Sequence, residues 1–128
     1  MAMQQYIIAL VDDDLTVRKV LARLLSVLGY RSVVFASAAE FLSAAATSEA
    51  VCLLIDIHLG ETSGFDLARQ LSAAGFRFPV IFMSSSDDDT IRERCMDLGC
   101  VAYLQKPFPE GRLLDAIATA MASNLQLA

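Results

Sequence analysis

The sequence predicts a single α/β domain, in which a doubly wound, five-stranded parallel sheet carries helices on both faces. Short apolar runs alternate five times with stretches of helical periodicity. Two of these runs, residues 51–55 and 80–83, are apolar throughout, as parallel strands covered on both faces are. The connections are short, which is typical of successive βα units joined by right-handed crossovers.

The strand candidates are the apolar runs at residues 6–11, 32–35, 51–55, 80–83 and 101–104. Apolar residues make up 55% of the 128 residues, which excludes a disordered chain and allows a sizeable core. No run approaches the roughly 20 residues needed to cross a bilayer. The N-terminus lacks a basic region followed by an apolar stretch and a cleavage site. We therefore expect no membrane span, no signal peptide and a cytoplasmic location.

Helical periodicity fills the gaps between the strands. The second helix begins at Ser37, with Glu40 three residues later in a capping-box pattern. The third, fourth and fifth helices are expected over residues 65–74, 87–98 and 110–123. The first helix has an apolar stripe of Val17, Val20, Leu21, Leu24, Leu25 and Leu28. The fifth is expected to bury Leu113, Leu114, Ile117 and Met121.

Three helices end in the same pattern, a glycine followed by an apolar residue, at residues 28–30, 74–76 and 98–100. Glycine accepts the left-handed conformation that stops a helix, and the next residue folds back onto the last turn. The chain has no linker-like stretch. We therefore expect one domain over residues 1–128, with a core at about residues 6–122.

Cysteine spacing and net charge limit the possible functions. Cys52, Cys95 and Cys100 form no C-x-x-C pair, and the single histidine, His58, lies far from the last two in sequence. This spacing favours small apolar side chains in a reducing compartment over a metal or redox site. The net charge of -5 argues against direct nucleic acid binding by this chain.

Polar residues follow four of the five strand candidates. Asp12 and Asp13 follow the first, Asp56 the third, Ser84 the fourth and Lys106 the fifth. The carboxyl ends of parallel strands share one edge of the sheet, where ligands bind in such folds. Two carboxylates ~4 Å apart repel by about 4 kcal/mol at an effective dielectric near 20. Lys106 alone leaves a charge deficit, so the cluster predicts a Mg²⁺ site.

Each of these residues also has a purely structural interpretation. The aspartates at positions 12–14 could cap the next helix, and Asp14 needs no other role. Asp56 could start a turn, although a carboxylate there could also act as a nucleophile toward phosphorus. The acidic run at 87–89 is interpreted as a helix start, not a second metal site. Tyr103, an aromatic residue in a strand, would by itself be a core residue.

Four motifs in order carry a resemblance to a known family. They are Val11-Asp12-Asp13, Ile55-Asp56 followed by Gly64, the segment PVIFMS at 79–84 and the segment YLQKPF at 103–108. In this order and at these spacings, the chain resembles the receiver domain of bacterial two-component response regulators over about residues 6–122. The resemblance implies the strand order 2-1-3-4-5 and a cis peptide bond between Lys106 and Pro107.

The resemblance also implies roles for the site residues. Asp56 would accept a phosphoryl group from the phosphohistidine of a sensor histidine kinase or histidine phosphotransfer protein. Ser84 and Lys106 would contact the phosphoryl oxygens, and Tyr103 would change rotamer on activation. Mg²⁺ would be held by Asp12, Asp13, Asp56 and the backbone carbonyl of His58. Phosphorylation would then alter the surface of helix four, strand five and helix five, which a downstream output domain or a homodimer partner reads.

The sequence departs from this family's pattern at two positions. Gly60 stands where the family usually has proline, which predicts a more mobile loop, and His58 occupies a position that tunes phosphoryl lifetime.

Two alternative functions remain. One alternative is a pseudo-receiver, an interaction module that is not phosphorylated. The other is an enzyme or flavin carrier on the same architecture, which the acidic run after strand one and His58 disfavour. We expect a phosphoacceptor with slow autodephosphorylation, not a turnover enzyme.

Overall fold

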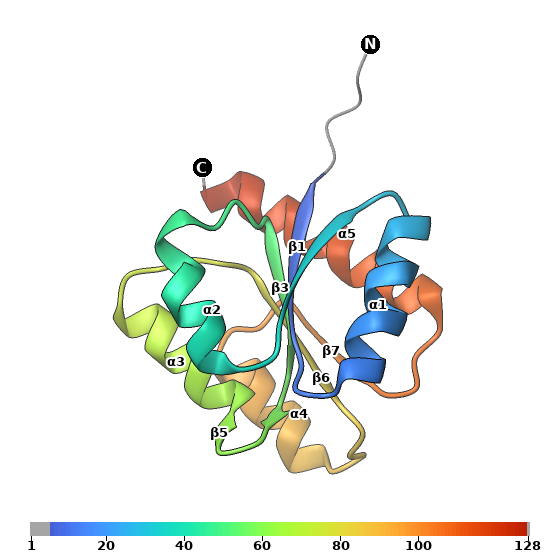
Figure 1. Cartoon of the computed structure of the whole chain (residues 1–128). Helices are drawn as coiled ribbons and strands as arrows, with labels where there is room; N and C mark the ends of the chain where they lie inside the picture. The colour runs from blue at the N-terminus through green and yellow to red at the C-terminus, as the bar shows by residue number, and fades with distance from the viewer. Residues whose placement is uncertain (1–5, 128) are drawn as a thin grey trace.

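The centre of the molecule is a five-stranded parallel sheet (Figure 1), described by a computed structural model over residues 6–127, with side chains described for residues 6–123. The order across the sheet is β2-β1-β3-β6-β7, which confirms the predicted order of the five main strands. All four neighbouring pairs are parallel. The strands are β1 (Ile7–Val11), β2 (Arg31–Phe35), β3 (Cys52–Asp56), β6 (Val80–Ser84) and β7 (Ala102–Gln105).

Helices cover both faces of the sheet, as the doubly wound arrangement requires (Figure 1). The helices α1 (Leu15–Val27) and α5 (Glu110–Leu127) lie on one face. The helices α2 (Ala38–Ala44), α3 (Gly64–Ala73) and α4 (Asp89–Asp97) lie on the other, with the short 3-10 helix η1 (Ala45–Thr47) after α2. The predicted five-fold alternation of strand and helix is therefore confirmed.

The core is divided into two clusters by the sheet. Alternate residues of each strand point to opposite faces, so Ile8 and Leu10 of β1 pack toward α1 and α5, whereas Ala9 and Val11 pack toward α2 and α3. All five residues of β3 are buried, as the apolar run predicts for a central strand. Each fully buried Leu or Ile contributes roughly 1.5–3 kcal/mol relative to an exposed one.

Local capping signals behave as the sequence indicates. Asp14 is the N-cap of α1, where its Oδ1 accepts hydrogen bonds from the backbone N–H groups of Thr16 and Val17. Ser37 caps α2 by accepting a hydrogen bond from the N–H of Glu40 at 3.1 Å. In return the Glu40 carboxylate accepts from Ala36, one residue before the N-cap. The glycines after α1, α3 and α4 all take positive φ, which confirms the three predicted helix ends.

Several details of the predicted elements are wrong. Val20 and Leu114 are exposed at 59% and 40%, because each lies on the flank of its helix, away from the sheet. The helix α4 begins at Asp89, not at 87, since Asp88 is its N-cap, and α5 continues past residue 123 to Leu127. A two-stranded antiparallel hairpin of β4 (His58–Leu59) and β5 (Thr62–Ser63) between β3 and α3 was not predicted.

Candidate functional site

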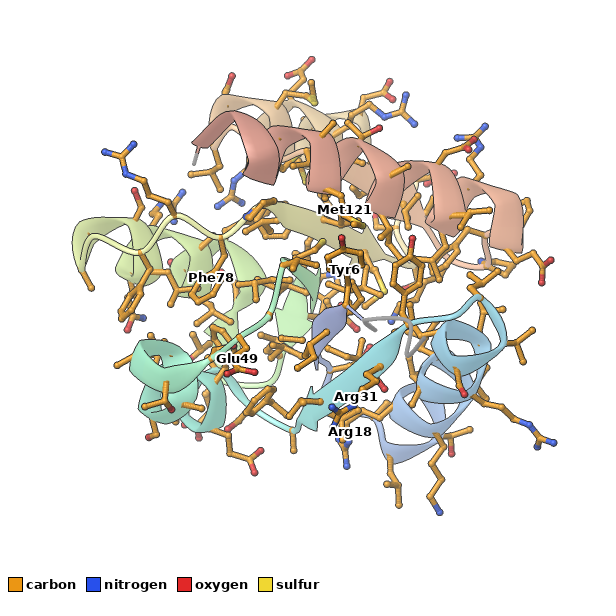
Figure 2. The ribbon with its side chains drawn as sticks, turned by 90° about the horizontal axis from the view of Figure 1, so that it is seen from above. Tyr6, Arg18, Arg31, Glu49, Phe78 and Met121 are labelled. Carbon is orange, nitrogen blue, oxygen red and sulfur yellow. The ribbon has the colours of Figure 1, made fainter. Side chains whose placement is uncertain are left out.

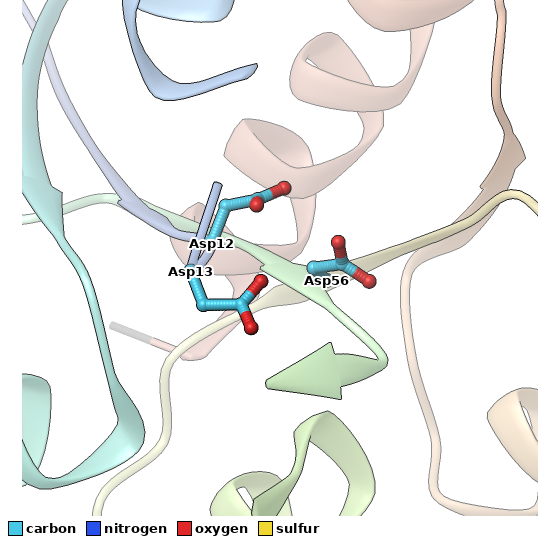
Figure 3. A group of neighbouring side chains, drawn as sticks. All are labelled: Asp12, Asp13 and Asp56. Carbon is cyan, nitrogen blue, oxygen red and sulfur yellow. The ribbon is translucent and has the colours of Figure 1, made fainter. Parts of the chain in front are cut away.

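Three carboxylates from two separate strands meet at the carboxyl edge of the sheet (Figure 3). Asp12 and Asp13 directly follow β1, and Asp56 is the last residue of β3. One carboxylate oxygen of each lies within 4.8 Å of the others. Asp12 has no exposed surface and Asp56 is 8% exposed, whereas Asp13 faces solvent. The predicted convergence of the three residues is confirmed.

Lys106, in the loop after β7, joins the two buried carboxylates. Its Nζ lies 3.0 Å from Oδ2 of Asp12 and 2.8 Å from Oδ2 of Asp56. The next peptide bond, to Pro107, is cis, as expected. Burial by itself would lower the pKa of Lys106, but hydrogen bonds with Asp56 and Asp12 outweigh it and raise the pKa above its ordinary value. The ammonium is therefore held in its charged form.

One lysine does not neutralise the cluster. Burial raises the pKa of Asp12, even though the N–H of Asp14 and the Lys106 ammonium stabilise its charged form, and the nearby charge of Asp56 adds to the increase. Three carboxylates against one ammonium leave an excess of negative charge at this edge. The electrostatics therefore favour a cation in the space between the carboxylates.

Backbone donors set the orientation of both buried carboxylates. The N–H of Asp14 donates to Oδ1 of Asp12, and the N–H of His58 donates to Oδ1 of Asp56, each at 2.9 Å. In each case the donor lies two residues after the acceptor, where the chain turns away from its strand. Each carboxylate therefore has one oxygen held by its own loop and the other by Lys106.

Arg18 is a contributor that the sequence analysis did not identify. Its Nη1 donates to the backbone carbonyl of Asp12 at 2.8 Å and ties α1 to the acidic loop. Its spacing could have predicted this contact, because residue 18 lies one turn after the N-cap Asp14.

Ser84 and Tyr103 reach the same edge but are tied to the loop after β6. Ser84, the last residue of β6, is fully buried and its Oγ accepts from the N–H of Ser86 at 3.0 Å. The Tyr103 hydroxyl donates to the carbonyl of Ser86 at 2.7 Å. Burial raises the pKa of Tyr103, which keeps its hydroxyl a donor. Tyr103 is half-buried, so it is not the fully buried core residue that its place in a strand would by itself predict.

Gly64, in the motif after Asp56, is explained by close packing. A Cβ at this position would lie 2.5 Å from the backbone oxygen of Asp56 and 2.9 Å from a methyl group of Ile55. The Gly64 N–H also donates to the carbonyl of Ile57 at 2.7 Å. The absence of a side chain therefore lets α3 start against the end of β3.

The second acidic run stays outside the cluster. Asp88 caps α4 by accepting hydrogen bonds from the N–H and the hydroxyl of Thr90, which lower its pKa. Asp87 and Asp89 are exposed. The interpretation of residues 87–89 as a helix start is confirmed.

Comparison with known proteins assigns the chain to a family. The model of the response regulator receiver domain matches residues 8–118. The chain belongs to this family. The response regulator protein TmoT of Ectopseudomonas mendocina is 36% identical over 118 residues, which cover 92% of this chain and 54% of that protein. The chain therefore spans about half the length of the curated relatives it matches.

Solved receiver structures agree with the fold. The crystal structure of FixJ-N superimposes with a TM-score of 0.86 at 30% identity and covers 94% of this chain and 96% of that one. The receiver domain of sensor histidine kinase PA1611 from Pseudomonas aeruginosa PAO1 superimposes with a TM-score of 0.83 at 26% identity, over 93% of this chain and 99% of that one. That structure has a magnesium ion coordinated in its active site cleft.

Membership carries general consequences. Receiver domains are signalling modules controlled by phosphorylation, and they work with histidine kinases and output domains. They bind magnesium in an acidic pocket, and the acidic cluster is present in this receiver. Within residues 6–127, none of the helices is long and apolar enough to cross a membrane.

The hairpin after β3 contains both departures from the family pattern. Gly60 takes φ +74° in the turn between β4 and β5, a value that proline, whose ring fixes φ near −65°, does not reach. The receiver family's usual proline would therefore require a different turn here. The side chain of His58 is exposed, whereas its N–H binds Asp56.

Proposed function

We propose that this receiver domain accepts a phosphoryl group on Asp56 from the phosphohistidine of a sensor histidine kinase or histidine phosphotransfer protein. The observation that carries the proposal is the position of Asp56. It closes a buried strand, remains 8% exposed and shares Lys106 with Asp12. An oxygen of Asp56 attacks phosphorus and forms a P–O bond, while the P–N bond to the donor imidazole breaks and the imidazole takes up a proton.

The donor set fits Mg²⁺. Asp12, Asp13 and Asp56 present carboxylate oxygens on an open side of the site, and we propose that the backbone carbonyl of His58 completes the protein ligands. Mg²⁺ favours a few oxygen ligands and retains several waters, which agrees with one exposed and two buried carboxylates. When bound, the ion neutralises charge on the carboxylates and on the oxygens of the transferring group.

Lys106 and Ser84 are proposed to contact the phosphoryl oxygens. The Lys106 ammonium already lies 2.8 Å from Asp56, so it can stabilise a negative charge there without a large movement. Ser84 ends the neighbouring strand, and its hydroxyl accepts a hydrogen bond from the N–H of Ser86. We propose that this hydroxyl donates a hydrogen bond to a phosphoryl oxygen once Asp56 is phosphorylated.

The switch is proposed to run through Ser86. A shift of Ser84 toward the phosphoryl group moves the loop that carries the Ser86 carbonyl, and Tyr103 is bonded to that carbonyl at 2.7 Å. Tyr103 then changes rotamer, and the surface of α4, β7 and α5 changes its population of conformations. We propose this surface as the contact for an output domain or for a second copy of the receiver.

The pseudo-receiver alternative is not favoured by any observation. Such a domain would lack an acidic residue or the lysine, whereas all three carboxylates, Ser84 and Lys106 are present at one edge. We also propose a cytoplasmic location, which agrees with the three free cysteines.

The test is chemical phosphorylation. Incubation with acetyl phosphate and Mg²⁺ is expected to add one phosphoryl group to the intact mass, and EDTA should prevent the gain. Asp56→Asn should abolish it, because the amide is not a nucleophile toward phosphorus. Asp66→Asn removes the same charge from an exposed position on α3 and should label like the wild type. A folded wild-type protein that gains no mass would contradict the proposal.

A further inference from the structure

Cys95 and Cys100 form a contacting pair at the end of α4. Cys95 lies in the last turn of this helix and is fully buried, and Cys100 follows the helix and is half-buried. The N–H of Cys100 donates to the carbonyl of Cys95 at 3.2 Å. Cys95 belongs to the core cluster against which Cys100 packs, and each thiol shifts the pKa of the other. Their sequence spacing gave no sign of a redox pair, because it matches no C-x-x-C motif.

The helix end explains why residues five apart meet. Gly99 turns the chain back at φ +73°, so residue 100 folds over residue 95. The same backbone hydrogen bond joins Tyr30 to Leu25 after α1 and Phe76 to Leu71 after α3. In those two turns the paired positions hold apolar residues, whereas in α4 both hold thiols. The fold thus brings two sulfur atoms into a place that usually holds a hydrophobic contact.

The two thiols differ in access and in acidity. Cys100 lines a cavity of about 480 Å³ that also contacts Phe76, Phe78 and Pro79. Figure 2 looks onto this edge of the sheet, where the strands begin and where Phe78 is labelled. The neighbouring thiol of Cys95 lowers the pKa of Cys100, and the thiol of Cys100 in turn raises the pKa of Cys95. Cys100 is therefore the accessible thiol with the greater thiolate fraction.

We propose that Cys95 and Cys100 are a peroxide-sensitive modification site that forms a reversible intramolecular disulfide. The Cys100 sulfur attacks a peroxide oxygen, so that an S–O bond forms, the O–O bond breaks and one water leaves. The Cys95 sulfur then attacks the sulfenic sulfur of Cys100. An S–S bond forms, the S–O bond breaks and a second water leaves with the Cys95 proton. Two thiols lose two electrons in total, and one hydrogen peroxide gains them.

The pairing is specific to these two thiols. Cys52 is buried in β3 and packs in the cluster that faces α1 and α5, whereas Cys95 packs in the cluster on the opposite face of the sheet. The bridge ties the end of α4 to the segment that enters β7. It lies at the edge opposite the acidic cluster, so it does not depend on phosphorylation of Asp56.

The test uses the full chain and hydrogen peroxide. Reduced protein is treated with peroxide, unfolded, alkylated with iodoacetamide and cleaved on the N-terminal side of aspartate. Cleavage before Asp97 separates Cys95, in peptide 89–96, from Cys100, in peptide 97–114. We expect these two peptides to be joined, to separate on reduction with dithiothreitol, and to leave Cys52 as the alkylated cysteine.

Matched cysteine variants and the oxidation of a nearby methionine serve as controls. Cys52→Ala should still give the joined peptides, whereas Cys100→Ser should leave Cys95 open to alkylation. Met96 is 61% exposed in the same peptide as Cys95 and reports the peroxide dose as its sulfoxide. Oxidised Met96 beside an alkylatable Cys95 in wild-type protein would overturn the proposal. So would a bridge that includes Cys52 or that joins two chains.

Discussion

Two runs of three aspartates stand between a strand and a helix at the same edge of this receiver, and they have different environments. Residues 12–14 follow β1, and residues 87–89 follow β6 after a loop of serines. Each run supplies the N-cap of the next helix, through Asp14 and Asp88. In the first run, however, Asp12 is fully buried and bound to Lys106, whereas the second run is exposed throughout.

The difference shows that acidic residues in a row do not make a site. Helix capping is the role that both runs share, because it depends only on the neighbouring residues. The first run gains a second role because Asp56 and Lys106 arrive from β3 and from the loop after β7. Among the residues that the structure describes, the acidic cluster contains Asp12, Asp13 and Asp56 but no residue of the second run.

The largest expected effect comes from removing the charge that the first run depends on. In EDTA at neutral pH, Lys106→Met should lower the free energy of unfolding by about 2 kcal/mol, below the value for a fully buried pair because Lys106 is partly exposed. Urea denaturation followed by circular dichroism measures this.

Lys19→Met removes the same charge from an exposed position on α1 and should change stability by less than about 0.5 kcal/mol. Adding Asp12→Asn to Lys106→Met should recover part of the loss, since one fewer carboxylate remains unpaired. Equal stabilities of the two lysine variants would mean that the Lys106 contacts contribute little.

The next effect separates the two runs by cation binding. Asp13→Asn should weaken Mg²⁺ binding by roughly tenfold, because it removes one of three clustered carboxylates. Asp89→Asn makes the same change in net charge in the second run and should leave the affinity within about twofold. Chemical-shift titration with Mg²⁺ measures both. Similar losses in the two variants would point to a general charge effect instead of a site.

The smallest effect concerns Asp88 and pH. Hydrogen bonds from the N–H and then the hydroxyl of Thr90 lower its pKa below the ordinary value of 3.8. Its contribution to stability is therefore fully present above that value and is lost as pH falls through the lower folded-state pKa. Asp12, whose pKa is raised, has the opposite sign.

Urea unfolding from about pH 6 to about pH 2.5 would compare the wild type with Asp88→Asn, which keeps a capping side chain but does not titrate. The wild type should lose stability relative to the variant only at the acidic end. A difference that stays constant with pH would show that the ionised carboxylate is not what stabilises the cap.

Local patterns in the sequence predicted most of the fold. The strands, the glycine-terminated helices and the caps at Asp14 and Ser37 depend on hydrogen bonds and packing within a few residues, so they can be read along the chain. The strand order came from the family resemblance, not from any pattern. The apolar stripes of the helices predicted burial less well at their margins, because Val20 and Leu114 fit the helical period yet remain exposed.

By itself, the sequence determined which polar residues would stand at the strand ends and that they would share one edge, since parallel strands end together. Only the tertiary structure decided the contacts among them. The Lys106 bridge, the Arg18 bond to the Asp12 carbonyl and the approach of Gly64 to Asp56 join segments set by packing of the whole chain. The meeting of Cys95 and Cys100 combines both causes. A local glycine turn brings them together, and packing against the core leaves Cys100 the more exposed of the two thiols.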